Sequence, residues 1–82
     1  MSKKTDTKGL LEFLIQNLVQ DREQVAISEL EKEDALIYEL RVSAEDRGRV
    51  IGKQGKTIKA IRKLLSAAAS GSERRVSVEL VE

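Results

Sequence analysis

Two glycines, Gly52 and Gly55, interrupt a helical stretch and limit what this chain can fold into more than any other feature. A capping-box signature, Ser43 followed three residues later by Asp46, opens a short helix before them. After them, apolar residues at helical spacing predict the longest helix: Ile58, Ile61, Leu64, Leu65 and Ala68. Because glycine has no Cβ, it permits unusual backbone angles and close approach of another backbone. The sequence therefore predicts two helices joined by a short loop.

Periodic apolar residues predict the other elements. We expect a first helix from about Gly9 to Gln20, with Asp6 or Thr7 as its N-cap. Alternating β-prone runs predict three strands, at about residues 25–30, 36–42 and 76–81. A short charged turn joins the first two strands, which indicates an antiparallel hairpin. Two helices separate the last two strands, so we expect these strands to pair in parallel.

The predicted order is helix, strand, strand, helix, helix, strand. It indicates an α+β domain in which helices pack on one face of a three-stranded mixed sheet. We expect a flexible N-terminus at residues 1–8 and a single domain at residues 9–82. Gly48 lies inside the short helix before the loop and should keep that helix short.

The residue types that are missing exclude several functions. The chain has no Cys and no His, which excludes disulfides, thiolate or imidazole metal sites and the common catalytic triads. We therefore expect no enzyme, no cofactor and no metal. Phe13 and Tyr38 are the only aromatic residues, which argues against nucleic-acid binding by aromatic stacking. No apolar run is long enough for a membrane span or a signal core, so we expect a soluble, cytoplasmic protein.

The net charge of +1 hides a strong segregation. The stretch from Arg47 to Ser72 carries seven basic and no acidic residues. The rest of the chain has 8 basic and 14 acidic residues, a net charge of −6. A polyanion should therefore approach the basic third of the chain. A run of charges is also typical of an ordinary solvated helix face.

The glycine loop admits two simpler interpretations. Gly55-Lys56-Thr57 matches the end of a nucleotide-binding P-loop, but Val50 stands where that motif needs glycine, and the loop follows a helix instead of a strand. A purely structural turn, or a helix-turn-helix DNA reader, fits two helices and two glycines. Neither explains why the tip is Lys53-Gln54 within a basic stretch.

The residues from Val50 to Ile61 resemble the signature of K-homology (KH) RNA-binding domains. That signature is an apolar pair, a G-x-x-G loop, and Ile at the third and sixth positions after the second glycine, here Ile58 and Ile61. With the element order, the resemblance covers about Leu10 to Val81. It implies a type II-like KH fold. It also implies membership of the KhpA family, the small stand-alone KH proteins of bacteria.

The resemblance implies single-stranded RNA binding with low sequence selectivity, because KH loops clamp the backbone of about four nucleotides. The residues implied to hold phosphates are Gly52, Lys53, Gln54 and Gly55, extended by Lys56 and Thr57 and flanked by Arg47 and Arg49. The apolar floor under the bases is implied to be Val50, Ile51 and Ile58, and the sequence leaves open which of Val50 and Ile51 faces the RNA. One edge of the site is implied to come from the strand at residues 37–42.

The resemblance also implies partners. It implies a homodimer, a heterodimer with a larger KH-containing protein of the Jag type, or both, acting as an RNA chaperone or post-transcriptional regulator. The alternative is a protein-interaction module with a vestigial loop. The basic loop tip argues against that alternative, because an acidic or apolar tip is expected where phosphate is not bound.

Overall fold

The computed structural model of the chain describes residues 6–70 and 74–81. Within them, the α-helices are α1 (Thr7–Gln16), α2 (Ala44–Ile51) and α3 (Lys56–Ala68). The strands are β1 (Ala26–Glu31), β2 (Ala35–Arg41) and β3 (Arg75–Leu80). Two short 3₁₀ turns complete the order, η1 (Arg22–Gln24) and η2 (Lys53–Gly55). The predicted order of helices and strands is confirmed, and it is that of the type II KH fold.

The sheet has the order β1-β2-β3, with β2 in the centre. β1 runs antiparallel to β2, with Leu30 opposite Ile37. β3 runs parallel to β2, with Val78 opposite Tyr38. The predicted hairpin, parallel pairing and mixed sheet are therefore confirmed. In the sheet that the structure describes, β2 is hydrogen-bonded to a strand on each side, and β1 and β3 are the edge strands.

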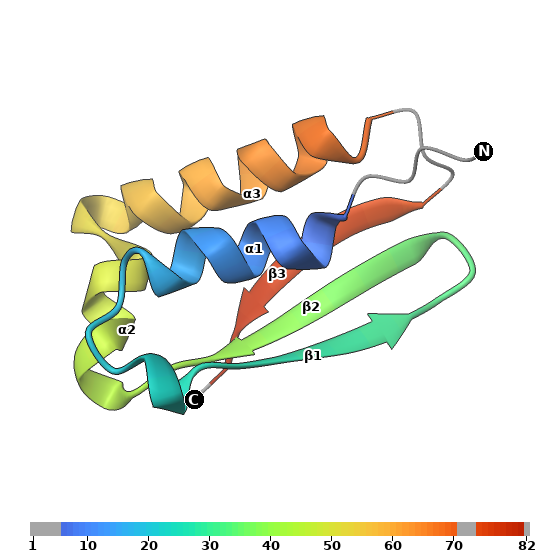
Figure 1. Cartoon of the computed structure of the whole chain (residues 1–82). Helices are drawn as coiled ribbons and strands as arrows, with labels where there is room; N and C mark the ends of the chain where they lie inside the picture. The colour runs from blue at the N-terminus through green and yellow to red at the C-terminus, as the bar shows by residue number, and fades with distance from the viewer. Residues whose placement is uncertain (1–5, 71–73, 82) are drawn as a thin grey trace.

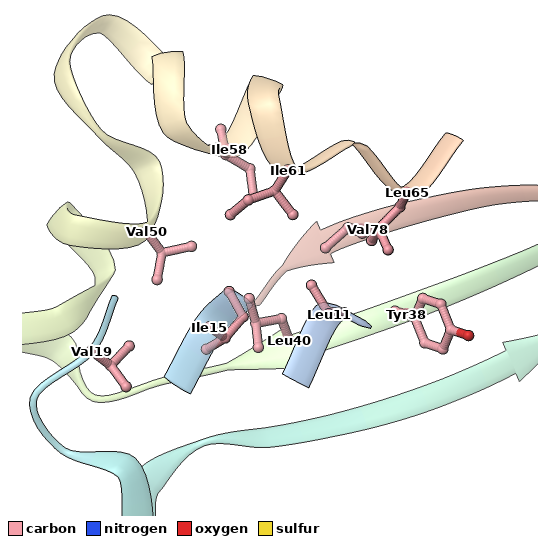
Figure 2. Close-up of a cluster of buried hydrophobic side chains, with 10 residues drawn as sticks. All are labelled: Leu11, Ile15, Val19, Tyr38, Leu40, Val50, Ile58, Ile61, Leu65 and Val78. Atoms are coloured by element: carbon pink, nitrogen blue, oxygen red, sulfur yellow. The ribbon is translucent and has the colours of Figure 1, made fainter. Parts of the chain in front are cut away.

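The helices cover one face of this sheet (Figure 1). Side chains alternate along β2, so Tyr38 and Leu40 point to the helices and are almost completely buried. Figure 2 shows the core that they form with the helices and β3. Its members are Leu11, Ile15, Val19, Tyr38, Leu40, Val50, Ile58, Ile61, Leu65 and Val78. The core thus fixes α2 and α3, the two helices that flank the glycine loop.

The first helix begins at Thr7, before the predicted start at about Gly9, while the prediction of Asp6 or Thr7 as its N-cap is confirmed for Asp6. Asp6 is its N-cap and accepts a hydrogen bond of 2.9 Å from the backbone N–H of Gly9. Thr7 is buried, and its Oγ1 shares a hydrogen bond of 2.6 Å with the hydroxyl of Tyr38. Burial raises the pKa of that hydroxyl, which stays protonated. Residues 6–8 therefore belong to the fold and not to a flexible N-terminus, while residues 1–5 lie outside the described residues.

The first helix also ends earlier than predicted, at Gln16 instead of Gln20. Asn17 follows the helix, and its side-chain amide donates to the carbonyl of Phe13 over 2.7 Å. Val19 is buried and Leu18 is partly buried although both lie beyond the helix. Their apolar side chains continue the helical spacing in the sequence, but they reach the core from the connection that leads to β1.

Asp46 ties that connection to α2. Ser43 caps α2 as predicted, with its Oγ accepting from the Asp46 N–H over 3.2 Å. The Asp46 carboxylate is 1% exposed and accepts hydrogen bonds of 3.0 Å from the backbone N–H groups of Gln20 and Asp21. It also pairs with the Arg49 guanidinium over 2.8 Å. α2 contains Gly48 and ends at Ile51, so the prediction of a short helix is confirmed.

These contacts change the acidity of Asp46. The two backbone hydrogen bonds, followed by those from Ser43 and Arg49, lower the pKa of Asp46 from 3.8 to about 2, against the opposing effect of burial. Between these two pKa values, the Asp46 carboxyl is therefore protonated in the unfolded chain and ionised in the folded chain. The stabilisation by Asp46 is complete above the ordinary pKa and is lost as the pH falls through the folded pKa.

We expect Asp46→Asn to lower stability at neutral pH, because an amide nitrogen replaces an accepting oxygen and leaves a backbone N–H without its partner. Its stability should also fall less than that of the wild type between pH of about 4 and about 2. Urea unfolding over that range measures both effects. Asp34→Asn, in the exposed β1–β2 turn, is the control and should keep the wild-type pH dependence. An Asp46→Asn curve parallel to the wild type would contradict this account.

Candidate nucleic-acid interface

The loop between α2 and α3 turns in four residues. Gly52 ends α2 with φ 78° and ψ 171°. Gln54 follows with φ 57° and ψ 25°, and Gly55 precedes α3 with φ 76° and ψ 14°. The Gly55 N–H donates to the Gly52 carbonyl over 3.1 Å and closes the turn. Gln54 is thus a side chain held at the exposed tip in a backbone region that favours glycine.

The two glycines are needed for different reasons. At Gly52, an added Cβ would lie 2.8 Å from the backbone nitrogen of Thr57 and closer still to the Thr57 side chain. At Gly55, the nearest atom would be Cε of Lys59 at 3.9 Å, so only the positive φ requires glycine there. The prediction of unusual backbone angles is therefore confirmed at both glycines, and at Gly52 the backbone of Thr57 also leaves no room for a side chain.

The loop leads directly into the N-terminus of α3. Among the α-helices that the structure describes, α1 and α2 have side-chain caps and α3 has none. No acidic residue lies in its first turn. The first backbone N–H groups of a helix lack partners within it, and the helix dipole favours an anion there. The exposed side chains of Lys53, Lys56 and Lys59 add positive charge at the same place.

The two arginines before the loop are less available than predicted. Arg49 remains 43% exposed, but Asp46 holds its guanidinium. Arg47 is half-buried on the same helix. Figure 1 places α2 and the loop at one end of the molecule, away from the β1–β2 turn. The arginines therefore lie near the loop, and the exposed lysines Lys53 and Lys56 lie in the loop and at the start of α3.

The predicted apolar floor is only partly at the surface. Val50 is completely buried and Ile58 is 8% exposed, both as part of the core (Figure 2). Ile51 is 38% exposed. The expectation that Val50 contacts a ligand is therefore corrected: it holds α2 from the core side. Of the apolar pair that the sequence left undecided, Ile51 is the one at the surface.

The predicted strand edge also needs correction. The strand at residues 37–42 was expected to form one edge of the site, but β2 is the central strand and its backbone is paired on both sides. The free edge next to α3 belongs to β3. Arg62 of α3 reaches this strand, where its Nε–H donates to the Val78 carbonyl over 3.1 Å. From the sequence, the run of charges that includes Arg62 indicated only a solvated helix face.

The described part of the chain supports neither a metal site nor a membrane-spanning helix. Residues 6–70 and 74–81 hold no group of three acidic side chains able to bind a metal ion. Over the same ranges, every helix is too short or too polar to span a membrane.

Comparisons with known proteins agree on one family. A family model described as KhpA/KhpB, KH domain, matches residues 8–80. The RNA-binding protein KhpA of Chlamydia pneumoniae is 48% identical over 75 residues, which cover 92% of this chain and 96% of the relative. The RNA-binding protein KhpA of Clostridium acetobutylicum is 46% identical over 74 residues, covering 90% of this chain and 99% of the relative. The loop lies inside the matched region.

We expect the glycine loop to tolerate alanine at only one end. Gly52→Ala should destabilise by about 3 kcal/mol or more, because it combines a glycine-only backbone region with a backbone clash. Gly55→Ala should cost about 1–2 kcal/mol, from its left-handed conformation alone. Urea unfolding measures both. Gly48→Ala, with open space at Cβ, is the control and should stabilise by about 0.5–1 kcal/mol. Equal losses at the two loop glycines would refute this explanation.

Proposed function

The chain belongs to the KhpA/KhpB family of KH domains, and from this premise we propose that it binds single-stranded RNA through the loop Gly52–Gly55. The observation that carries the proposal is a tight, exposed loop that delivers Lys53 and Lys56 to the uncapped N-terminus of α3. Several relatives of this chain are named as RNA-binding proteins, which supports the same function.

The loop binds phosphates in this mechanism. The backbone N–H groups at the start of α3 donate to phosphate oxygens, and the helix dipole favours the negative charge. Lys53 and Lys56 neutralise phosphates and release counterions, while Gln54 at the tip supplies a side-chain amide. Thr57 packs against Gly52 and keeps the loop close to the helix. Contacts to phosphate carry no sequence information, so this part of the site binds RNA with little selectivity.

The strength of binding follows from the small number of phosphates. A KH loop holds about four nucleotides. For four phosphates on a single strand, the logarithm of the binding constant should fall with a slope of about −3 against the logarithm of salt concentration. We expect micromolar affinity for one domain, and tighter binding when two domains act on one RNA.

We also propose that the protein works in the cytoplasm with a partner KH domain, as an RNA chaperone or regulator without catalytic activity of its own. The partner is a second copy, a larger Jag-type protein, or both. Two exposed apolar side chains support a partner surface: Phe13 of α1 is 65% exposed and Leu64 of α3 is 50% exposed. Large apolar side chains at a surface often mark protein contacts. They also favour the second candidate function, an interaction module whose loop is vestigial.

We expect Lys53→Asp with Gln54→Asp to abolish RNA binding, because two carboxylates replace a cation and an amide at the phosphate site. Asp tolerates the left-handed conformation of residue 54, so the fold should survive, as circular dichroism will check. Fluorescence anisotropy of a labelled single-stranded RNA at two salt concentrations measures the loss. Wild-type binding should weaken with salt at the slope given above.

The matched control is a pair of single variants. Lys53→Asp and Lys32→Asp make the same charge change, but Lys32 lies in the β1–β2 turn at the other end of the molecule (Figure 1). Only Lys53→Asp should weaken binding strongly. If both variants weaken it equally, overall charge is responsible and the loop is not the site. If the wild type binds no RNA, the interaction module is the better description.

Association is tested separately. We expect the wild type to sediment as a dimer at concentrations of tens of micromolar, and Phe13→Ser with Leu64→Ser to sediment as a monomer, because the apolar contact is lost. Analytical ultracentrifugation measures the mass. Leu30→Ser, which changes an exposed apolar side chain on β1, is the control and should leave the dimer intact. A wild type that is monomeric throughout would rule out the homodimer.

A further inference from the structure

One face of the sheet is left open, because the three α-helices all lie on its other face (Figure 1). Tyr38 and Leu40 point to the helices, so Ile37 of the same strand points to the open face. Its partners in register are Leu30 of β1 and Ser77 of β3. Leu30 is 44% exposed there, and Ile37 is half-buried. These three residues form the middle row of the open face, and its two larger side chains are apolar.

The charges on the two sides of this row have opposite sign. Glu39 and Glu79 follow it on β2 and β3, where they are in register and project from the same face. Arg75 precedes it on β3, beside Ala35. Within residues 6–70 and 74–81, the structure shows no ion pair for Arg75, Glu39 or Glu79. Like charges side by side on neighbouring strands are destabilising, so a cation placed over the two carboxylates would relieve a repulsion.

This arrangement is complementary to a second copy of itself. Arg75 and Glu79 lie on β3 at equal distances from Ser77, on opposite sides of it. A two-fold axis along the middle row would reverse the strand direction and place each Arg75 over the Glu79 of the other copy. It would also bring the apolar side chains of the two middle rows together. Two ion pairs and one apolar contact then form at once, as a two-fold interface requires.

The size of the face limits the strength of this contact. β3 has six residues, which span about 20 Å, and three strands side by side span about 14 Å. The face therefore covers about 280 Å², against about 800 Å² that each partner buries in a stable interface. Free copies should pair through it only at concentrations of about 1 mM. Copies that occupy neighbouring positions on one RNA reach effective concentrations of that order.

We propose that the open sheet face centred on Ile37 binds the same face of a second copy, and that this contact makes the protein bind long RNA cooperatively. The inference rests on the proposed RNA binding, because the contact acts between copies on one strand. The surface is separate from Phe13 and Leu64, which lie in the helix layer on the other side of the sheet. With a contact on each side, successive copies can follow one another along an RNA.

The test is an exchange of charges across the proposed contact. The variants are Arg75→Glu, Glu79→Arg and the double variant that carries both changes. Each single variant places like charges opposite each other, whereas the double variant restores opposite charges without altering the net charge. Glu29→Arg is the matched control. It makes the same charge change on an exposed residue of β1, but Glu29 is in register with Tyr38 and so lies on the helix side of the sheet.

Binding is measured by fluorescence anisotropy on oligouridylates of about 6 nucleotides, which fill one KH loop, and of about 40, which hold several copies. On the long RNA, a bound wild-type neighbour should raise the affinity of the next copy by about three- to ten-fold. Both single variants should lose this cooperativity, while the double variant and Glu29→Arg should show it. On the short RNA, binding should be non-cooperative throughout. An open face that only contacts water predicts no effect of the exchange, and that result would overturn the proposal.

A second measurement needs no RNA and so separates the contact from the proposed function. In ¹H–¹⁵N spectra of the wild type, the backbone signals of Ile37 and Ser77 should move as the protein concentration rises from about 0.1 to about 2 mM. They should stay constant in Arg75→Glu. Constant signals in the wild type would overturn the contact between copies while the loop remains the RNA site. A wild type that shows the shifts but binds neither RNA overturns the proposed function and, with it, the cooperative role of this face.

Discussion

The buried carboxylate of Asp46 is the interaction on which the geometry of this chain depends most. Among the buried residues that the structure describes, it is the charged one, and it accepts hydrogen bonds from a connection 25 residues earlier in the sequence. That contact ties α2 to the connection that follows α1, in addition to the packing of Val50 in the core. The same carboxylate pairs with Arg49, which lies in the last turn of α2 before the glycine loop.

Most of the fold could be predicted because its signals are local. The capping residues Asp6 and Ser43, the alternation along β2 and the helical spacing in α3 each depend on neighbours within a few residues. The loop could be predicted for the same reason, since Gly52 and Gly55 occupy the positions where the backbone requires glycine. The end of α1 could not, because Val19 continues the apolar spacing and is buried although the helix has already ended.

The errors at the candidate site concern the surroundings of the loop. The hairpin and the parallel pairing with β3 were both predicted, and together they place β2 in the centre of the sheet, so the expectation that β2 also forms an edge of the site did not follow from them. Val50 and Ile51 are adjacent and equally apolar, and only the packing of α2 decides which one is buried. Arg62 looks like any cation on an exposed helix until β3 lies beside it. Local patterns thus located the loop but not its surroundings.

The parallel pairing of β2 with β3 has a consequence for how the protein acquires its shape. Ala35 pairs with Arg75, so these two strands can pair only after α2, the loop and α3 have been synthesised and positioned. Non-local pairing of this kind is slow compared with the formation of a hairpin or a helix. A nascent chain should therefore leave the ribosome with its hairpin formed and the second side of β2 unpaired. During that interval the exposed edge of β2 is the segment most open to mispairing, and chaperone binding there would have its greatest effect.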